Sequence, residues 1–258
     1  MNLKFLILLC LNSFFLCAEQ PSLTIITSVF NGDRYIEHFL DQIAKQTIYD
    51  ECQHIVINAN SPGNEEEVIL EFARTHPNLE YYRLDKDPGL YAVWNMAIKK
   101  SKADYLVNAN LDDRLAPFAY ELLLSELKNH PEIDLVYSDA YITTMPNQVF
   151  GKHVYESFYT VPEFSYKALQ NGCFIGSHPI WRKSMNDKYG LFNEEFFCAG
   201  DWEMWLRAAS QGSQFLHVKS LSAVNYSGPE ALSSRRDLVE IRDWERNYIN
   251  WKYQIKGK

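Results

Sequence analysis

The chain has little positive charge, few cysteines and no glycine-rich phosphate motif. Its 25 lysines and arginines are outnumbered by 33 acidic residues, which gives a net charge of −8 and argues against the broad basic face that nucleic-acid binding requires. None of its five cysteines has CxxC spacing, so a zinc site is disfavoured. Neither GxGxxG nor GxxxxGK(S/T) occurs, which disfavours a dinucleotide-binding fold and a P-loop. No repeat or Pro/Gly-rich linker divides the 258 residues, a length that suits one large α/β domain or two small ones.

The N-terminal segment differs from the rest of the chain. Phe5 to Cys17 is almost entirely apolar, and Leu16-Cys-Ala18 can precede a cleavage point before Glu19. This is the layout of a secretory signal peptide, and the run is short for a membrane span. Residues 1–18 are therefore predicted to be a signal peptide or, alternatively, a signal anchor through which the protein associates with a membrane.

The cysteine count points to a different compartment. Cys52, Cys173 and Cys198 remain after the N-terminal segment, and an odd number cannot all pair within one chain. This gives weak support to a reducing compartment. The secretory pathway or a membrane surface is the expected location, with the cytoplasmic face kept as an alternative.

Apolar runs rich in β-branched residues alternate with segments of helical periodicity in the first half of the chain. This alternation predicts parallel βαβ units and an α/β fold. After Gly151 the pattern loosens, and the final segment is amphipathic. The predicted strands are 23–29, 54–57, 79–84, 105–107, 134–137, 180–181 and 215–218; the predicted helices are 34–46, 65–76, 91–100, 117–129, 166–171, 201–210 and 237–255, with a polar loop over 225–236.

Two adjacent acids, Asp112 and Asp113, follow the predicted strand Tyr105-Leu-Val107. Open α/β sheets bind ligands at the carboxyl ends of their strands. Two neighbouring carboxylates repel each other unless a cation lies between them or one takes up a proton. Mg²⁺ and Mn²⁺ prefer oxygen ligands and often bridge carboxylate to phosphate. A metal–diphosphate site is therefore expected, and the alternative is a polar turn that caps the helix starting near Pro117.

Four segments, in their order and spacing, resemble the family 2 glycosyltransferases, which have the GT-A fold. They are Thr24-Ile-Ile-Thr-Ser-Val-Phe-Asn31, Asp87-Pro-Gly-Leu-Tyr-Ala-Val-Trp-Asn95, Asn110-Leu-Asp-Asp113 and Gly200-Asp-Trp-Glu-Met-Trp-Leu-Arg207. The resemblance covers about 21–236. It implies a Rossmann-like αβα sandwich around a mostly parallel, mixed sheet. It also implies a domain over 21–258, with a nucleotide-binding half at about 21–114, an acceptor half at about 115–236 and a C-terminal helix at about 237–255.

The same resemblance implies an activity and its residues. The expected reaction is metal-dependent, inverting transfer of a sugar from a nucleotide diphosphate sugar, UDP-sugar first, to a glycan, a lipid-linked acceptor or another hydroxyl. Asp113 would bind Mn²⁺ or Mg²⁺, Asp112 would lie near the ribose or the metal, and Asp201 would be the catalytic base. The further residues assigned to the donor site are Ser28, Phe30, Asn58, Gly89 and Asn95; those assigned to acceptor or phosphate are His178, Trp202 and Arg235.

The chain departs from the family pattern at two places. Asn58 stands where the family has an acid that contacts the base, and Gly200 replaces the first acid of the pair that precedes the catalytic helix. The alternative function is therefore a catalytically impaired nucleotide- or glycan-binding module on the same fold. Asp201 can also be a helix cap, and His178 a structural histidine. A nucleotidyltransferase is disfavoured, because the loop after the first strand has one glycine and one arginine.

Overall fold

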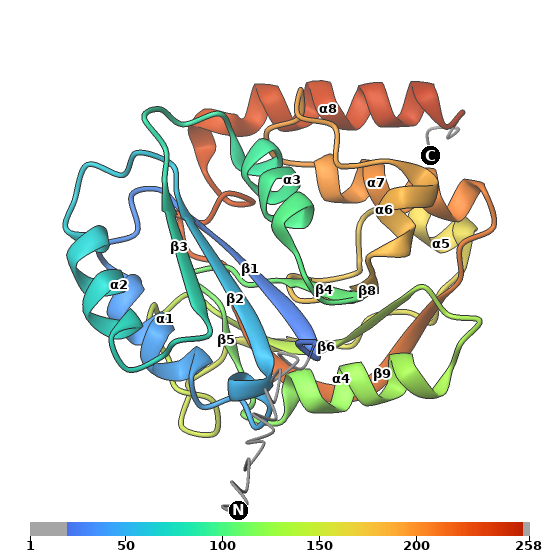
Figure 1. Cartoon of the computed structure of the whole chain (residues 1–258). Coiled ribbons are helices and arrows are strands. Elements are labelled where there is room, and N and C mark those ends of the chain that lie inside the picture. Colours follow the sequence, from blue (N-terminus) through green and yellow to red (C-terminus); the bar gives the residue numbers. More distant parts are fainter. Residues whose placement is uncertain (1–19, 255–258) are drawn as a thin grey trace, which may run out of the picture.

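A nine-stranded sheet forms the centre of the molecule (Figure 1). The structure is a computed structural model, and it describes residues 20–254; the predicted signal peptide or anchor at 1–18 lies outside them. The strands are β1 Leu23–Val29, β2 Cys52–Asn58, β3 Leu79–Arg83, β4 Tyr105–Asn108, β5 Arg114–Leu115, β6 Leu135–Thr143, β7 Ser157–Tyr159, β8 Ile180–Arg182 and β9 Phe215–Tyr226. Their order is β3-β2-β1-β4-β8-β6-β9-β5, and β7 pairs with β6.

Most strands run in one direction. β3, β2, β1 and β4 are mutually parallel, and β6 is parallel to β9. β8 is antiparallel to both β4 and β6, so those two strands share a direction. Only the short strands β5, β7 and β8 run the opposite way. This confirms the predicted α/β class with a mostly parallel, mixed sheet.

Helices cover both faces of the sheet, which makes an αβα sandwich. Successive residues of β1 show why: Ile25 belongs to a buried cluster that includes residues of α1, α2 and α4, and Ile26 belongs to the other cluster, with residues of α3 and α7. Strands buried on both faces are continuously apolar, as β1 and β2 are. The helices are α1 Ile36–Ile43, α2 Glu65–Ala73, α3 Leu90–Lys100, α4 Ala119–Asn129, α5 Tyr166–Gln170, α6 Ser184–Tyr189, α7 Gly200–Ser210 and α8 Val239–Lys252, with 3-10 turns at Tyr49–Glu51 and Arg236–Leu238.

The structure extends two strands and adds elements that the sequence pattern does not indicate. β6 and β9 continue past their predicted ends at 137 and 218. Their pairing shifts register at Asp139, which interrupts the alternation on which a strand prediction depends. β5, β7 and α6 were not predicted, because each is at most six residues long.

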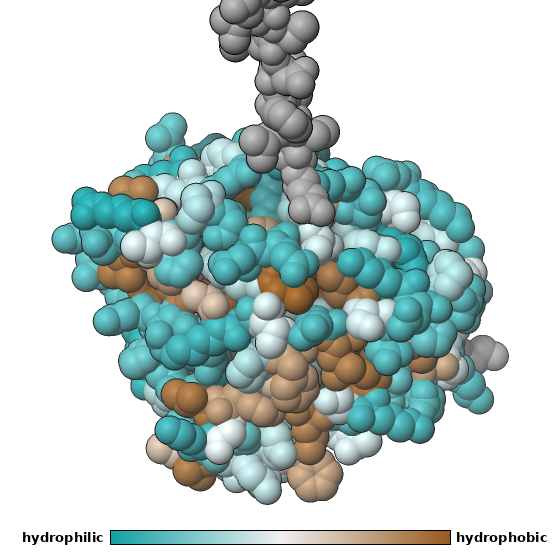
Figure 2. Space-filling view, turned by 60° about the horizontal axis from the view of Figure 1, so that its bottom comes forward, coloured by the Kyte–Doolittle hydropathy of each residue, from teal (hydrophilic) through white to brown (hydrophobic). Residues whose placement is uncertain are grey.

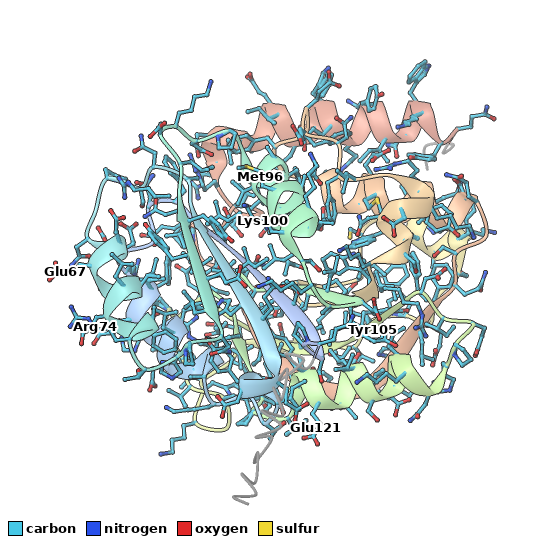
Figure 3. All side chains as sticks on the ribbon, in the orientation of Figure 1. Glu67, Arg74, Met96, Lys100, Tyr105 and Glu121 are labelled. Atoms are coloured by element: carbon cyan, nitrogen blue, oxygen red, sulfur yellow. The ribbon has the colours of Figure 1, made fainter. Side chains whose placement is uncertain are left out.

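The face of the molecule drawn in Figure 2 is mostly hydrophilic, with hydrophobic patches between the polar side chains. Exposed charged side chains such as Glu67, Arg74 and Glu121 point outward from α2 and α4 (Figure 3). Among residues 20–254, no helix has both the length and the apolar character needed to cross a membrane.

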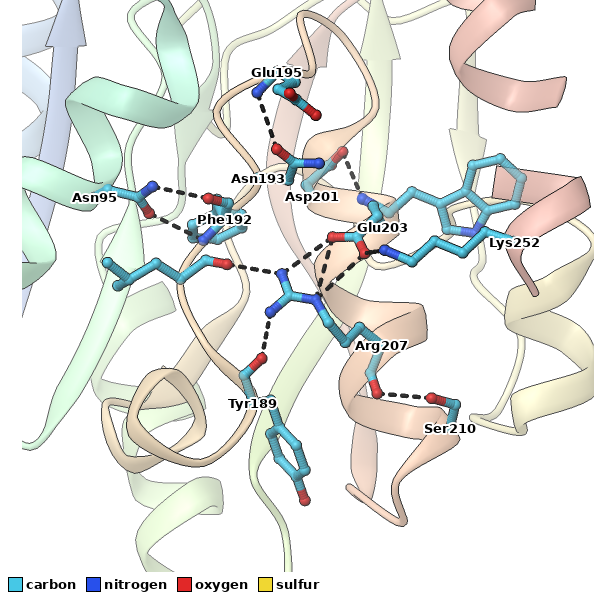
Figure 4. Close-up of polar contacts among 12 residues, drawn as sticks. Asn95, Tyr189, Phe192, Asn193, Glu195, Asp201, Glu203, Arg207, Ser210 and Lys252 are labelled. Carbon is cyan, nitrogen blue, oxygen red and sulfur yellow. Dashed lines mark hydrogen bonds and ion pairs between the residues drawn. The ribbon is translucent and has the colours of Figure 1, made fainter. Parts of the chain in front are cut away.

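A buried ion cluster joins α7 to α8 (Figure 4). The carboxylate of Glu203, whose side chain is 1% exposed, accepts hydrogen bonds from Arg207 at 3.1 Å and Lys252 at 2.7 Å. The hydroxyl of Tyr253 donates to the same carboxylate at 2.8 Å. Glu203, two residues from the expected base, therefore has a structural role.

Removal of Arg207 is expected to destabilise the fold. Arg207→Leu should lower the free energy of unfolding by about 3 kcal/mol, the low end of the range for breaking a buried pair, because Lys252 still compensates Glu203. Arg74→Leu is the matched control, since Arg74 and Glu71 form an exposed pair and such pairs contribute less than about 1 kcal/mol. Urea denaturation measures both variants, and an equal, small loss for the two would contradict the prediction.

Candidate active site

The candidate residues lie at the carboxyl ends of neighbouring parallel strands. Val29 at the end of β1 pairs with Asn58 at the end of β2, and β4 ends beside β1 at Asn108. The loops that follow these strands carry the acidic pair and part of the predicted donor site. This is the edge at which open α/β sheets bind ligands.

The acidic pair is anchored to the end of β9. One carboxylate oxygen of Asp113 accepts the backbone N–H of Tyr226 at 2.9 Å, and the other accepts the amide of Asn110 at 3.1 Å. Burial and the neighbouring Asp113 raise the pKa of Asp112 to about 7, and burial raises the pKa of Asp113. The guanidinium of Arg114 donates to backbone carbonyls and to Asn147. Without a cation, burial therefore favours the protonated form of these carboxyl groups, and a bound cation would favour the ionised form.

This donor set fits a hard divalent cation. Asp112 and Asp113 offer only oxygen atoms, and the two carboxyl groups are adjacent in the chain. Within residues 20–254, no group of three or more His, Cys, Asp and Glu is placed to hold a metal ion. Mg²⁺ sites in enzymes that act on phosphates commonly use one or two carboxylates and take their remaining ligands from substrate and water.

An ion pair and a hydrogen bond attach the loop between β9 and α8 to the segment that follows β1. Arg34, just after β1, pairs with Glu230 of this loop at 2.6 Å, and the hydroxyl of Tyr35 donates to the same carboxylate at 2.9 Å. Arg235, a predicted phosphate ligand in this loop, pairs with Asp237 at 2.5 Å and is 42% exposed. Its contact with phosphate stays a prediction.

Asp201, the expected base, is the second residue of α7. One carboxylate oxygen, Oδ1, accepts the backbone N–H of Trp202 at 2.8 Å and the hydroxyl of Tyr91 at 3.4 Å. The other oxygen, Oδ2, has the Cys173 thiol as its neighbour at 4.0 Å. Burial raises the pKa of Asp201 to about 6. A carboxylate with a pKa near neutrality is well suited to accept a proton.

The backbone before α7 is held by a buried acid from the C-terminal helix. Glu245 of α8 accepts the N–H groups of Phe197, Cys198 at 3.0 Å and Ala199 at 2.8 Å. These N–H groups lie just before the helix and have no partner within it. Glu245 therefore fixes the position from which Asp201 projects.

The loop Cys173–Ser177 connects the two acidic centres. Cys173 lies beside Asp201, and Ser177 lines the same small pocket as Asp113. The backbone between these two residues spans at most about 14 Å. The acidic pair and Asp201 therefore lie near opposite ends of this short loop.

The predicted donor residues differ in burial: Ser28, Phe30 and Gly89 are exposed or half-buried, whereas Asn58 and Asn95 are buried. Phe30 is 47% exposed at the end of β1, Ser28 is half-buried, and Gly89 has φ 94° at the start of α3, a conformation that favours glycine. Asn58 is buried and accepts the N–H of Ser61 at 2.7 Å.

The side chain of Asn95, like that of Asn58, forms hydrogen bonds within the protein. Its amide bonds the backbone N–H and C=O of Phe192 at 3.0 and 2.9 Å, and the carboxylate of Glu194 at 2.9 Å. It thus holds the loop before α7 against α3. Donor contacts of both residues stay predictions. Asn95 would have to change partners, whereas the buried Nδ2 of Asn58 has no hydrogen-bond partner among the described residues.

His178 and Trp202 have structural partners. The imidazole of His178 is buried, lies 3.2 Å from the Ser138 hydroxyl and 3.3 Å from that of Ser222, and has its pKa lowered by burial to about 4. The indole N–H of Trp202 donates to the carbonyl of Leu169 at 2.7 Å, which joins α7 to α5. These contacts favour a structural role for both side chains over contact with the acceptor or a phosphate.

The sequence did not indicate Tyr91, Cys173 or Glu245 as site residues. Tyr91 lies inside a recognised motif, but only its helical spacing was informative. Glu245 lies 44 residues beyond Asp201 in the sequence, and no local pattern connects them. The one available signal was Gly200, whose missing side chain leaves space that another group can occupy.

Comparisons with known proteins bear on the family and the fold. The family model for glycosyl transferase family 2 matches residues 24–190. The chain is 20% identical over 202 residues to an uncharacterized glycosyltransferase, MJ1057, of Methanocaldococcus jannaschii, covering 76% of this chain and 68% of that protein. It is 26% identical over 203 residues to a chondroitin synthase of Pasteurella multocida, covering 78% of this chain but only 20% of the synthase.

Solved structures share the fold. TarS 1–349 of S. aureus in complex with UDP-GlcNAc superposes with a TM-score of 0.68 at 17% identity, covering 90% of this chain and 71% of that one. The mannosyltransferase PcManGT of Pyrobaculum calidifontis, in complex with GDP-Man and Mn²⁺, gives 0.67 at 17% identity, covering 93% and 66%. These likenesses confirm the predicted GT-A type of fold. With the family match over residues 24–190, they lead to the conclusion that the chain belongs to glycosyl transferase family 2 and is a glycosyltransferase.

Proposed function

We propose that the protein transfers a sugar from a nucleotide diphosphate sugar, with UDP-sugar as the first candidate, to a hydroxyl of a glycan or lipid-linked acceptor. The observation that carries the proposal is the placement of Asp112 and Asp113 and of Asp201 at the two ends of one short loop. One centre suits a diphosphate and its cation, and the other suits an acceptor hydroxyl. Solved structures of similar fold contain UDP-GlcNAc, or GDP-Man with Mn²⁺, which supports this class of donor.

The residues of this chain divide the chemistry between them. Asp113, with Asp112, would hold Mn²⁺ or Mg²⁺. When bound, the cation would neutralise charge that develops on the leaving diphosphate. Asp201 accepts the proton of the acceptor hydroxyl through Oδ2, the oxygen without a short hydrogen bond. The acceptor oxygen then bonds to the anomeric carbon as the bond from that carbon to the diphosphate breaks. Attack from the face opposite the leaving group inverts the anomeric configuration.

The binding-module alternative rests on Gly200 and Asn58. Gly200 has a steric explanation, because a Cβ atom there would lie 2.7 Å from the ring of Tyr91. Asp201 itself is retained, with a pKa suited to proton transfer. We therefore favour the enzyme over the impaired module. We also propose the domain division at about 114 and location in the secretory pathway or at a membrane through residues 1–18.

A donor screen on the protein lacking residues 1–18 tests the proposal. Release of nucleoside diphosphate from UDP- and GDP-sugars is measured with and without Mn²⁺. Metal-dependent release from at least one donor is expected. Calorimetric binding of a donor without any release, in the presence of candidate glycan acceptors, would instead favour the binding module.

A further inference from the structure

We propose that Tyr91 is the positioning residue for Asp201: its ring fills the space left by Gly200, and its hydroxyl orients the Asp201 carboxylate. The inference rests on the proposed role of Asp201 as base. It extends that role to a side chain on α3, 110 residues away in the sequence.

The first observation is steric. A Cβ atom built on Gly200 would lie 2.7 and 2.8 Å from carbon atoms of the Tyr91 ring. The ring has no room to retreat, because Tyr91 is 2% exposed. It packs edge-on against Trp94 at 5.3 Å and stacks on Phe192 at 5.8 Å. The first residue of α7 is thus glycine because the Tyr91 ring occupies the place of its side chain.

The second observation is the direction of the hydroxyl. Tyr91 donates to Oδ1 of Asp201, the oxygen that also accepts the Trp202 N–H. With Oδ1 engaged by two donors, Oδ2 is the oxygen available to a substrate hydroxyl. The Tyr91 bond is 3.4 Å long, so we expect it to be weaker than an ordinary O–H···O bond.

The third observation is the charge around Asp201. Cys173 precedes β8, Cys198 precedes α7 and Glu245 projects from α8, and each has an electrostatic interaction with Asp201. None of these groups is cationic. Tyr91 is the one side chain that lowers the pKa of Asp201 by a hydrogen bond, against the rise caused by burial.

The test removes the hydroxyl and keeps the ring. Tyr91→Phe is expected to lower kcat about threefold, less than an ordinary hydrogen bond to a charged group would give, because this bond is 3.4 Å long; the KM for the donor should be unchanged. The acid limb of the kcat/KM profile should move to higher pH, because the lost hydrogen bond favoured the ionised carboxylate. Tyr189→Phe is the matched control, since the Tyr189 hydroxyl is buried in the same core cluster without a hydrogen-bond partner.

A second readout does not depend on turnover. ¹³C NMR of labelled aspartate carboxyls should give a higher pKa for Asp201 in Tyr91→Phe than in the wild type or in Tyr189→Phe. Gly200→Ala, whose methyl group forces the start of α7 and the Tyr91 ring apart, should raise this pKa too, and the double variant with Tyr91→Phe should raise it no further, because both changes remove the same contact.

The outcomes separate the two proposals. An active wild type whose Tyr91→Phe variant has the same kcat and the same Asp201 pKa overturns the inference and leaves the proposed function standing. A wild type that transfers no sugar overturns the proposed function, and the NMR titration still decides whether Tyr91 sets the state of Asp201. Additive pKa changes in Tyr91→Phe and Gly200→Ala also contradict the inference.

Discussion

Asp201→Asn is expected to reduce sugar transfer at least about 100-fold, the scale of a lost general base, while donor affinity stays within about twofold. Asparagine keeps an oxygen that can accept the N–H of Trp202 and the hydroxyl of Tyr91, so the start of α7 should keep its geometry. It cannot accept the proton of the acceptor. Steady-state kinetics gives the loss in kcat, and calorimetry gives the affinity for UDP.

The control for this substitution is Asp243→Asn. Asp243 is an exposed residue of α8, so the same chemical change there should leave transfer and donor affinity unaltered. A loss of donor affinity in Asp201→Asn that matched its loss of rate would contradict the assignment. Asp201 would then belong to the donor site rather than act on the acceptor.

Asp113→Asn is expected to weaken Mn²⁺-dependent binding of UDP about 100-fold, because a bound cation supplies several kcal/mol of charge stabilisation and this variant loses an anionic ligand. Calorimetry of UDP with and without Mn²⁺ measures the effect. Asparagine presents an N–H₂ group either to the Tyr226 N–H or to the Asn110 amide, so some local rearrangement is expected.

A companion variant separates charge from this rearrangement. Asp112→Asn removes the same charge next to Asp113 without breaking the contact to Tyr226. It should also weaken Mn²⁺-dependent binding, with a thermal midpoint close to that of the wild type. Unchanged affinity in both variants would exclude the acidic pair as the metal site.

The sequence predicted the fold because its strongest signals are local. The runs that became β1 and β2 are apolar on both faces, and the helices between them have clear periodicity. The sequence missed the extension of β9, because the shift at Asp139 breaks the alternation, and it missed the short elements β5 and β7. These are stabilised by pairing with distant strands, which a local pattern cannot indicate.

Motifs that place acids at strand and helix ends made Asp113 and Asp201 candidates, and their roles stay predictions. Asn95 and His178 show the limit of this approach: polar residues in a motif can bind ligand or hold the protein together, and here their partners are Phe192 and Ser138. Tyr91 shows the converse limit, since a residue predicted only as part of a helix contacts Asp201 through tertiary packing.

The central claim is that Asp112 and Asp113 hold the cation of a nucleotide sugar within reach of Asp201. Anomalous X-ray diffraction of crystals grown with Mn²⁺ and UDP tests it most directly. The predicted result is a Mn²⁺ peak at coordination distance, about 2–2.6 Å, from a carboxylate oxygen of Asp113 or Asp112 and in contact with the diphosphate. A UDP molecule bound with its Mn²⁺ elsewhere, or bound at full affinity with no Mn²⁺ at the acidic pair, would contradict it.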